Sequence, residues 1–283
     1  MNDPGCGLSR RRSEGDHERL LLRPSTRADR RADFVIRIGV LTPHAAIGPE
    51  EEFAAMAPGR LATEVVRIPT EAGLAGAGSG APTTPAELRA LMEPLVLDEA
   101  AKRLADSIDA VGHASTTSAY AVGFDQEAEM VSRLSALLAV PVAATCVSAV
   151  LALRALAVQR VALVGAPWFD AELNHLGAAY FRSQGFEVVS SASAELSQEP
   201  DRIASADVVK WTARHVSDDA EGVFIGGNGF RAVAAIEPLE ASIGRPVLTS
   251  NQVLLWNLLA RVGASFEING FGQLFAYEAR SAS

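Results

Sequence analysis

The chain has 283 residues, of which 48% are hydrophobic and 21% are charged, a globular balance that excludes a collagen-like, coiled-coil or wholly disordered protein. Its formal net charge is −9 at pH 7, and an acidic chain without a basic stripe is a poor binder of nucleic acid. No stretch reaches the roughly 18 apolar residues of a membrane-spanning helix, so we expect no membrane partner.

The first 33 residues differ from the rest of the chain. Residues 1–33 carry eight arginines against six acidic residues and lack hydrophobic periodicity, so we predict a disordered, Arg-rich tail. The two cysteines of the chain, Cys6 and Cys146, are too few for a disulfide framework. A reducing, cytoplasmic setting is therefore the expected localisation.

From residue 34 onward, short apolar runs alternate with amphipathic segments. The expected strands cover 34–41, 65–68, 109–113, 141–144, 160–165, 186–189, 223–226 and 246–249. The expected helices cover 85–105, 125–138, 145–156, 170–184, 200–216, 230–242 and 253–262. Repeated βα units of this kind predict an α/β protein with parallel sheets covered by helices on both faces. Such a chain could form one barrel or two smaller doubly wound sheets.

Small hydroxyl residues, amides and glycines gather in the loops that follow the expected strands. These loops are 42–46, 113–120, 144–148, 165–170, 226–231 and 249–252. Ligands of parallel sheets bind at the carboxyl ends of the strands, where backbone N–H groups and hydroxyls suit a carboxylate or a phosphate. Phosphate-binding and dinucleotide-binding glycine motifs are absent from the sequence, and its five histidines have no metal-ligand spacing. We therefore expect no nucleotide, no metal and no other cofactor.

The order and spacing of these segments resemble the aspartate/glutamate racemase superfamily, specifically the branch of maleate cis-trans isomerases and arylmalonate decarboxylases. The segments that carry the resemblance are 37–43, 114–120, 153–156, 160–163, 227–236, 245–252 and 270–275. Together they extend over nearly the whole chain after the tail.

The resemblance implies two similar doubly wound parallel-sheet domains with a cleft between them. The expected N-terminal domain comprises residues 34–141 plus 249–275, and the second domain comprises residues 142–248. A (βα)8 barrel is the alternative architecture. The resemblance also implies chemistry on the carbon beside a carboxylate, performed by one cysteine from each domain without a cofactor.

Both family cysteine positions hold other residues in this chain, Ser115 and Gly227. A serine needs a base to act as a nucleophile, and His113 is the nearest candidate, with His44 as another. Cys146 follows an expected strand at the first turn of a helix, a position that lowers a thiol pKa. Its alternative role is to pack the helix against the sheet. The catalytic candidates are thus Ser115, Cys146 and His113.

The substrate-binding candidates all lie on strand-end loops. They are Pro43, His44, Thr116, Thr117, Tyr120, Trp168, Gly227, Asn228 and Gly229. The hydroxyl run 115–118 exceeds what helix capping needs, so we favour ligand binding over capping alone. For Asn228, we favour anion binding at a helix N-terminus over a tight turn. The acids 50–52 are interpreted as solvated residues that begin a helix.

Three functional hypotheses follow. The first is a cofactor-independent isomerase of small dicarboxylic acids that resembles maleate cis-trans isomerase. The second is a decarboxylase of arylmalonate or malonate type, a lyase whose dioxyanion pocket stabilises an enediolate. The third is a non-catalytic carboxylate-binding protein. In each case the partner is a small carboxylate, and the sequence leaves open whether the chain forms a homo-oligomer.

Overall fold

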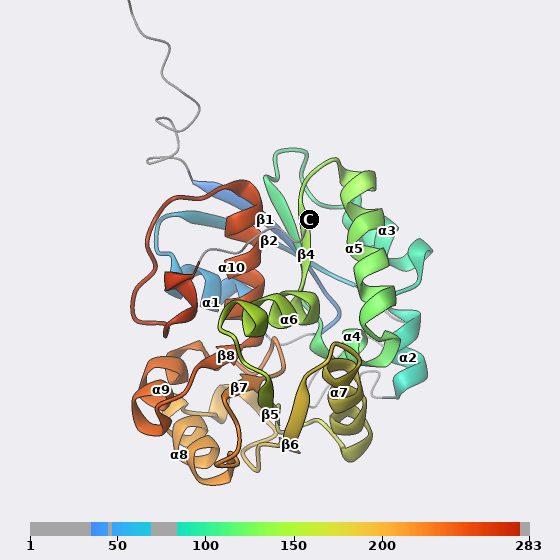
Figure 1. Cartoon of the computed structure of the whole chain (residues 1–283). Helices are drawn as coiled ribbons and strands as arrows, with labels where there is room; N and C mark the ends of the chain where they lie inside the picture. Colours follow the sequence, from blue (N-terminus) through green and yellow to red (C-terminus); the bar gives the residue numbers. More distant parts are fainter. Residues whose placement is uncertain (1–34, 45–46, 69–83, 278–283) are drawn as a thin grey trace, which may run out of the picture.

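Two parallel sheets with the same strand order form the centre of the computed structural model, which describes residues 35–44, 47–68 and 84–277 (Figure 1). The first sheet has the order β2-β1-β3-β4 and the second β6-β5-β7-β8. The strands are β1 (Ile36–Thr42), β2 (Leu61–Arg67), β3 (Ala110–His113), β4 (Val142–Ala144), β5 (Arg160–Gly165), β6 (Glu187–Ser193), β7 (Gly222–Ile225) and β8 (Val247–Thr249). The repeated order confirms two doubly wound units instead of one barrel.

Strands β3, β4, β7 and β8 are short and completely buried, as expected for strands covered on both faces. Their register aligns the carboxyl ends within each sheet. Leu41 pairs with His113 and His113 with Ala144, while Ile225 pairs with Thr249. The loops that leave these strands therefore emerge together at one edge of each sheet.

Ten α-helices of the described residues flank the sheets. They are α1 (Pro49–Met56), α2 (Pro85–Ala90), α3 (Pro94–Ala101), α4 (Thr116–Val122), α5 (Phe124–Leu138), α6 (Thr145–Ala155), α7 (Ala171–Ser183), α8 (Ser205–His215), α9 (Ile236–Ile243) and α10 (Ser250–Val262). Helices α6 and α10 lie side by side where the two sheets approach each other (Figure 1). No described helix is long and apolar enough to cross a membrane.

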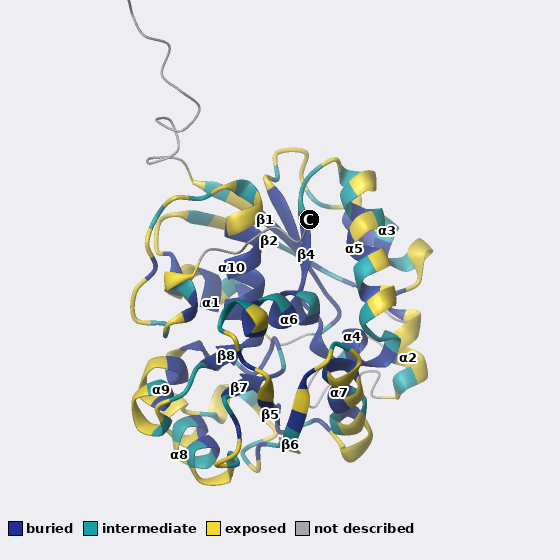
Figure 2. Cartoon of the chain, viewed as in Figure 1, coloured by how far each residue is buried: buried dark blue, intermediate teal, exposed yellow. Residues whose placement is uncertain are grey.

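Helix α10 connects the two units. It begins directly after β8 of the second sheet and packs against β3 and β4 of the first. Gly112 of β3 permits this contact, because a Cβ there would lie 3.1 Å from Leu258 Cδ1. Most of α10 is buried, in agreement with the dark ribbon in Figure 2.

Three expected helices differ from those in the structure. The segment 85–105 forms two helices, because Pro94 lacks an N–H group and follows Glu93 in an extended conformation. Similarly, 200–216 divides into a 3-10 turn and α8, and α9 begins only at Ile236 instead of residue 230. Helix α4, by contrast, occupies a segment that the sequence analysis treated as a loop.

The predicted domain boundary falls inside the first unit. Strand β4 pairs with β3 in the first sheet, although the second domain was expected to begin at residue 142. The return of the chain to the first unit after residue 249 agrees with the position of α10. The predicted tail and Cys6 lie outside the described residues, and the domain bounds as a whole stay a prediction.

Candidate functional site

The site is built where the loop after β3 meets the loop after β7. Thr116 is the first residue of α4, and its backbone N–H donates to Asn228 Oδ1 at 3.2 Å. The Thr116 hydroxyl approaches the same oxygen at 3.1 Å and Ser250 Oγ at 2.9 Å. Thr116, Asn228 and Ser250 are all buried, so these bonds form a polar junction between the two sheets.

The other half of the Asn228 side chain is held from α6 and α10. Asn228 Nδ2 donates to Thr145 Oγ1 at 3.1 Å and to Asn251 Oδ1 at 2.8 Å. Thr145 Oγ1 also lies 3.4 Å from Asn228 Oδ1. Asn251 Nδ2 in turn donates to the backbone oxygen of Asn228 at 2.8 Å. Both ends of the carboxamide are therefore engaged.

Gly227 presents a backbone donor to the same junction. Its N–H donates to Thr116 Oγ1 at 3.2 Å and to Ser250 Oγ at 2.9 Å. Its φ is +113°, a conformation that favours glycine, and a Cβ at this position would lie 2.8 Å from Ala166 Cβ. The structure thus gives a steric reason for glycine at position 227, where the resemblance places the second family cysteine.

Glu52 extends the network into α1. Its Oε2 accepts from Asn251 Nδ2 at 2.7 Å and its Oε1 from the Val233 N–H at 2.8 Å. Burial raises the pKa of Glu52 to about 7, against the opposing effect of these two hydrogen bonds and of the Arg231 charge. The expectation of a solvated acid is wrong for Glu52. The signal was available, because Glu52 lies three residues after Pro49 and four before Met56, which are buried on the same helical face.

Ser115 serves as the N-cap of α4. Its Oγ accepts from the Ser118 N–H at 3.3 Å and donates to Ser118 Oγ at 2.8 Å. The side chain is buried, and its hydrogen is directed at Ser118. Capping therefore accounts for its bonds in this structure, and a catalytic role stays a prediction.

We expect Ser115→Ala to destabilise the protein by about 1 kcal/mol, because α4 loses its capping acceptor. Urea unfolding of the variant measures this loss. Ser132→Ala is the matched control, since the Ser132 side chain is exposed on α5 and bonds only to Ala128 O one turn back. Equal losses in both variants would contradict the capping role.

His113 is buried at the end of β3. Among the described residues, neither of its ring nitrogens has a hydrogen-bond partner. Burial, followed by the nearby His44, lowers the pKa of His113 to about 4, so the ring is neutral at pH 7. The structure shows no hydrogen bond from this ring to Ser115, and the role of His113 as a base stays a prediction.

Cys146 lies at the first turn of α6, as expected, and is completely buried. Its Sγ lies 3.8 Å from Thr116 O, and its N–H donates to Glu127 Oε1 at 3.2 Å. Burial and the neighbouring Glu127 raise the pKa of the thiol well above its ordinary value. The expected lowering of this pKa by the helix N-terminus is therefore wrong in direction, and this opposes a catalytic thiolate.

Glu127 is the centre of a second buried polar cluster. The Tyr180 hydroxyl, from a helix of the second unit, donates to its Oε2. Burial raises the pKa of Glu127 to about 7, although hydrogen bonds from Tyr180 and from the backbone of Cys146 lower it. The sequence analysis gave no role to Glu127.

The remaining candidates surround the junction to different extents. Tyr120 is buried, its hydroxyl would lie 3.2 Å from a Cβ at Gly226, and its ring lies 6.0 Å from that of Tyr180. Trp168 is half-buried and makes an edge contact with Phe230 at 6.1 Å. The burial of the others differs: Pro43 and Gly229 are buried, whereas His44 and Thr117 are intermediate.

The structure thus brings Thr116, Gly227 and Asn228 into one hydrogen-bonded group. Thr145, Ser250 and Asn251 belong to the same group but were not selected from the sequence. These three residues could have been selected by their position in the sequence, because each follows a strand end within a loop already recognised as polar. Within the described residues, no three His, Cys, Asp or Glu side chains gather in a way that could hold a metal ion.

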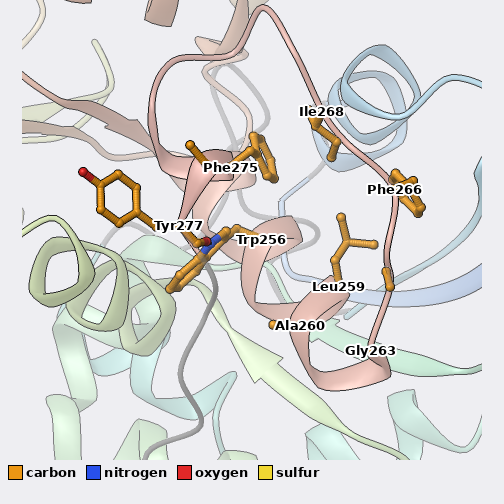
Figure 3. A pocket seen from close by; sticks show the side chains of 10 residues that line it. Trp256, Leu259, Ala260, Gly263, Phe266, Ile268, Phe275 and Tyr277 are labelled. Atoms are coloured by element: carbon orange, nitrogen blue, oxygen red, sulfur yellow. The ribbon is translucent and has the colours of Figure 1, made fainter. Parts of the chain in front are cut away.

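A separate pocket of about 400 Å³ lies beside the later turns of α10 (Figure 3). Its lining includes Trp256, Leu259, Phe266 and Phe275. The indole N–H of Trp256 donates to Tyr277 O at 2.8 Å. None of the predicted site residues lines this cavity, so it is distinct from the junction at the strand ends.

The fold and the junction define a two-domain α/β protein of the racemase type, with polar loops at the facing strand ends. The family model "Arylmalonate decarboxylase" matches residues 88–275, and the chain belongs to this family. No significant match was found among curated protein sequences.

Solved structures share the fold. A maleate isomerase from Pseudomonas putida S16, in a structure with maleate, is 23% identical with a TM-score of 0.73, and the alignment covers 86% of this chain and 99% of that one. A maleate cis-trans isomerase from Nocardia farcinica with a covalently bound succinylcysteine intermediate is 19% identical with a TM-score of 0.73, covering 85% and 98%. An unliganded arylmalonate decarboxylase is 19% identical with a TM-score of 0.67, covering 86% and 99%.

Proposed function

We propose that the chain binds a small carboxylic acid at the junction of the two sheets and decarboxylates acids of the malonate type without a thiol or a cofactor. The observation that carries this proposal is the convergence of donors on Asn228 Oδ1. The N–H and hydroxyl of Thr116 reach this amide oxygen at 3.2 and 3.1 Å. The Thr145 hydroxyl lies 3.4 Å from the same oxygen and 3.2 Å from His113 O. An amide oxygen has the size and acceptor character of a carboxylate oxygen, and it marks where such an oxygen fits.

Neutral donors of this kind suit a reaction that develops charge on oxygen. In the proposed reaction, the bond between the α-carbon and one carboxylate breaks, and its electron pair forms an enediolate on the remaining carboxylate. CO₂ leaves as this bond breaks, and a proton from water then adds to the α-carbon, leaving hydroxide. Backbone and hydroxyl donors fixed in a buried site stabilise such an oxyanion more strongly than water does.

The maleate isomerase type of reaction, which the sequence analysis put first, is favoured less by these contacts. Of the two family cysteine positions, Ser115 is occupied with capping and Gly227 has no side chain. Cys146 is the one free cysteine among the described residues, and its burial raises its pKa. A thiol needs a thiolate to add to a double bond, so this environment opposes isomerisation through a covalent thiol adduct.

A panel of malonate, phenylmalonate and maleate tests the proposal. Binding is followed by thermal shift, and turnover by NMR of the products. Loss of CO₂ from either malonate is the expected result. Conversion of maleate to fumarate would support the isomerase instead, and binding without turnover would support a carboxylate-binding protein. Absence of any binding would overturn all three hypotheses.

Thr116→Val should weaken carboxylate binding at least about tenfold, because a hydroxyl that bonds a charged group contributes about 1.5–3 kcal/mol. The replacement keeps the shape of the side chain and removes only its hydroxyl. Titration calorimetry with malonate measures the change. Thr212→Val is the matched control: Thr212 is completely buried in α8, and its hydroxyl has no hydrogen-bond partner among the described residues. Unchanged affinity in Thr116→Val would remove this hydroxyl from the site.

A further inference from the structure

Asn228 occupies the donor set that the proposed substrate needs. Its Oδ1 accepts hydrogen bonds from the N–H and hydroxyl of Thr116, and its Nδ2 donates to Thr145 and Asn251. The side chain is 2% exposed. A substrate carboxylate and the Asn228 carboxamide therefore cannot use the Thr116 donors at the same time.

We propose that the side chain of Asn228 is an internal ligand of the carboxylate site and lowers its affinity, because each bound acid must displace it. This inference rests on the proposed carboxylate site. An ionised carboxylate forms stronger hydrogen bonds with the same donors than a neutral amide does. Each acid must first break the bonds that Asn228 makes, so Asn228 lowers the apparent affinity for every carboxylate by the same factor.

The contacts of the Asn228 backbone allow its side chain to move away from the Thr116 donors while the backbone stays in place. Asn251 Nδ2 donates to the Asn228 backbone oxygen at 2.8 Å. Gly48 packs so closely on that oxygen that a Cβ there would lie 2.0 Å from it. The backbone of Asn228 is thus held on two sides, and displacement requires a change of side-chain rotamer without movement of the loop.

Glu52 fixes the orientation of the internal ligand. Because Glu52 and the Asn228 backbone oxygen both accept from Asn251 Nδ2, the Oδ1 of Asn251 faces the Asn228 side chain. Only the Nδ2 end of Asn228 can donate to that oxygen. The Oδ1 end is consequently directed at Thr116, which is the end that resembles a carboxylate.

Asn228→Ala tests this inference directly, with acetate and malonate as probes in titration calorimetry. An internal competitor lowers apparent affinity by the fraction of time that the site is open. We therefore expect both probes to bind at least about tenfold more tightly to the variant, since two or more hydrogen bonds no longer have to be exchanged. Asn257→Ala is the matched control, because Asn257 is also a buried amide but bonds to Ser148 and Arg261 outside the site. The affinity of Asn257→Ala for both probes should equal that of the wild type.

The outcomes separate this inference from the proposed function. Equal or weaker binding by Asn228→Ala, with normal binding by the wild type, would overturn the internal ligand and leave the carboxylate site standing. Absence of binding to every variant would overturn both. Asn228→Ser provides a second, smaller polar side chain should the alanine variant fold poorly. In the wild type, malonate should shift the side-chain amide NMR signals of Asn228 and leave those of Asn257 in place, and unmoved Asn228 signals at saturation would overturn the inference.

Discussion

Gly227→Cys, which restores a cysteine at the second family position, is expected to destabilise the protein by about 2–6 kcal/mol. Two separate effects contribute. The φ of +113° disfavours any side chain, and the new Cβ would lie 2.8 Å from Ala166 Cβ. Urea unfolding measures the loss, and no gain of maleate isomerisation should accompany it.

Two further variants separate the causes of this loss. Ala166→Gly in the Gly227→Cys background removes the close contact and should restore part of the stability, while the backbone strain remains. Ser115→Cys is the matched control at position 115, where φ is −149° and the backbone is not strained, so only the capping contribution of about 1 kcal/mol should be lost. A Gly227→Cys protein as stable as the wild type would show that this loop adopts a second backbone conformation.

Most strands and helices could be predicted from the sequence because their signals are local, whereas the choice of two sheets over one barrel rested on the family resemblance. Strand β5 has the bounds that its apolar run predicted, and α7 begins after Asp170 and ends before Gly185, as capping residues indicate. The errors in the predicted helices also have local causes. Pro94 divides one predicted helix, and α4 is a short helix hidden in a run of hydroxyl residues that favours loops.

The site could be predicted only in part, because its bonds join distant parts of the chain. Thr116 and Asn228 are 112 residues apart, and Glu52 and Asn251 are 199 residues apart. A strand-end position indicates which loops face the site. It does not indicate that the Asn228 side chain accepts from Thr116 or that Glu52 accepts from Asn251, since both contacts depend on packing between the two sheets.

The expectation for Cys146 was wrong in direction for a specific physical reason. A helix N-terminus lowers a thiol pKa only when its N–H groups are available to the thiolate. Here the Cys146 N–H already donates to Glu127, so an anionic group occupies the start of α6. Burial and the Glu127 charge then both raise the pKa of the thiol.

Glu127 itself leads to the last prediction, which concerns stability and pH. Burial raises its pKa in the folded protein from 4.5 to about 7. Below pH 4.5 the carboxyl is protonated in both folded and unfolded chains, so it contributes no difference. Between about pH 4.5 and 7 the unfolded chain releases a proton that the folded chain retains, and the free energy of unfolding therefore falls as pH rises. Above about pH 7 the loss is complete, at about 3 kcal/mol for this group.

Glu127→Gln should remove this share of the pH dependence, because glutamine keeps the acceptor for the Cys146 N–H but cannot ionise. Relative to the wild type, the variant should gain stability between pH 5 and 8 as measured by urea unfolding across that range. Glu52→Gln should remove a similar share, since burial also raises the pKa of Glu52 to about 7. Glu129→Gln removes the same formal charge from an exposed position of α5 and serves as the control. If Glu127→Gln and Glu129→Gln have the same pH profile, Glu127 must reach water in the folded protein, and the contact that joins it to Tyr180 of the second unit would not persist in solution.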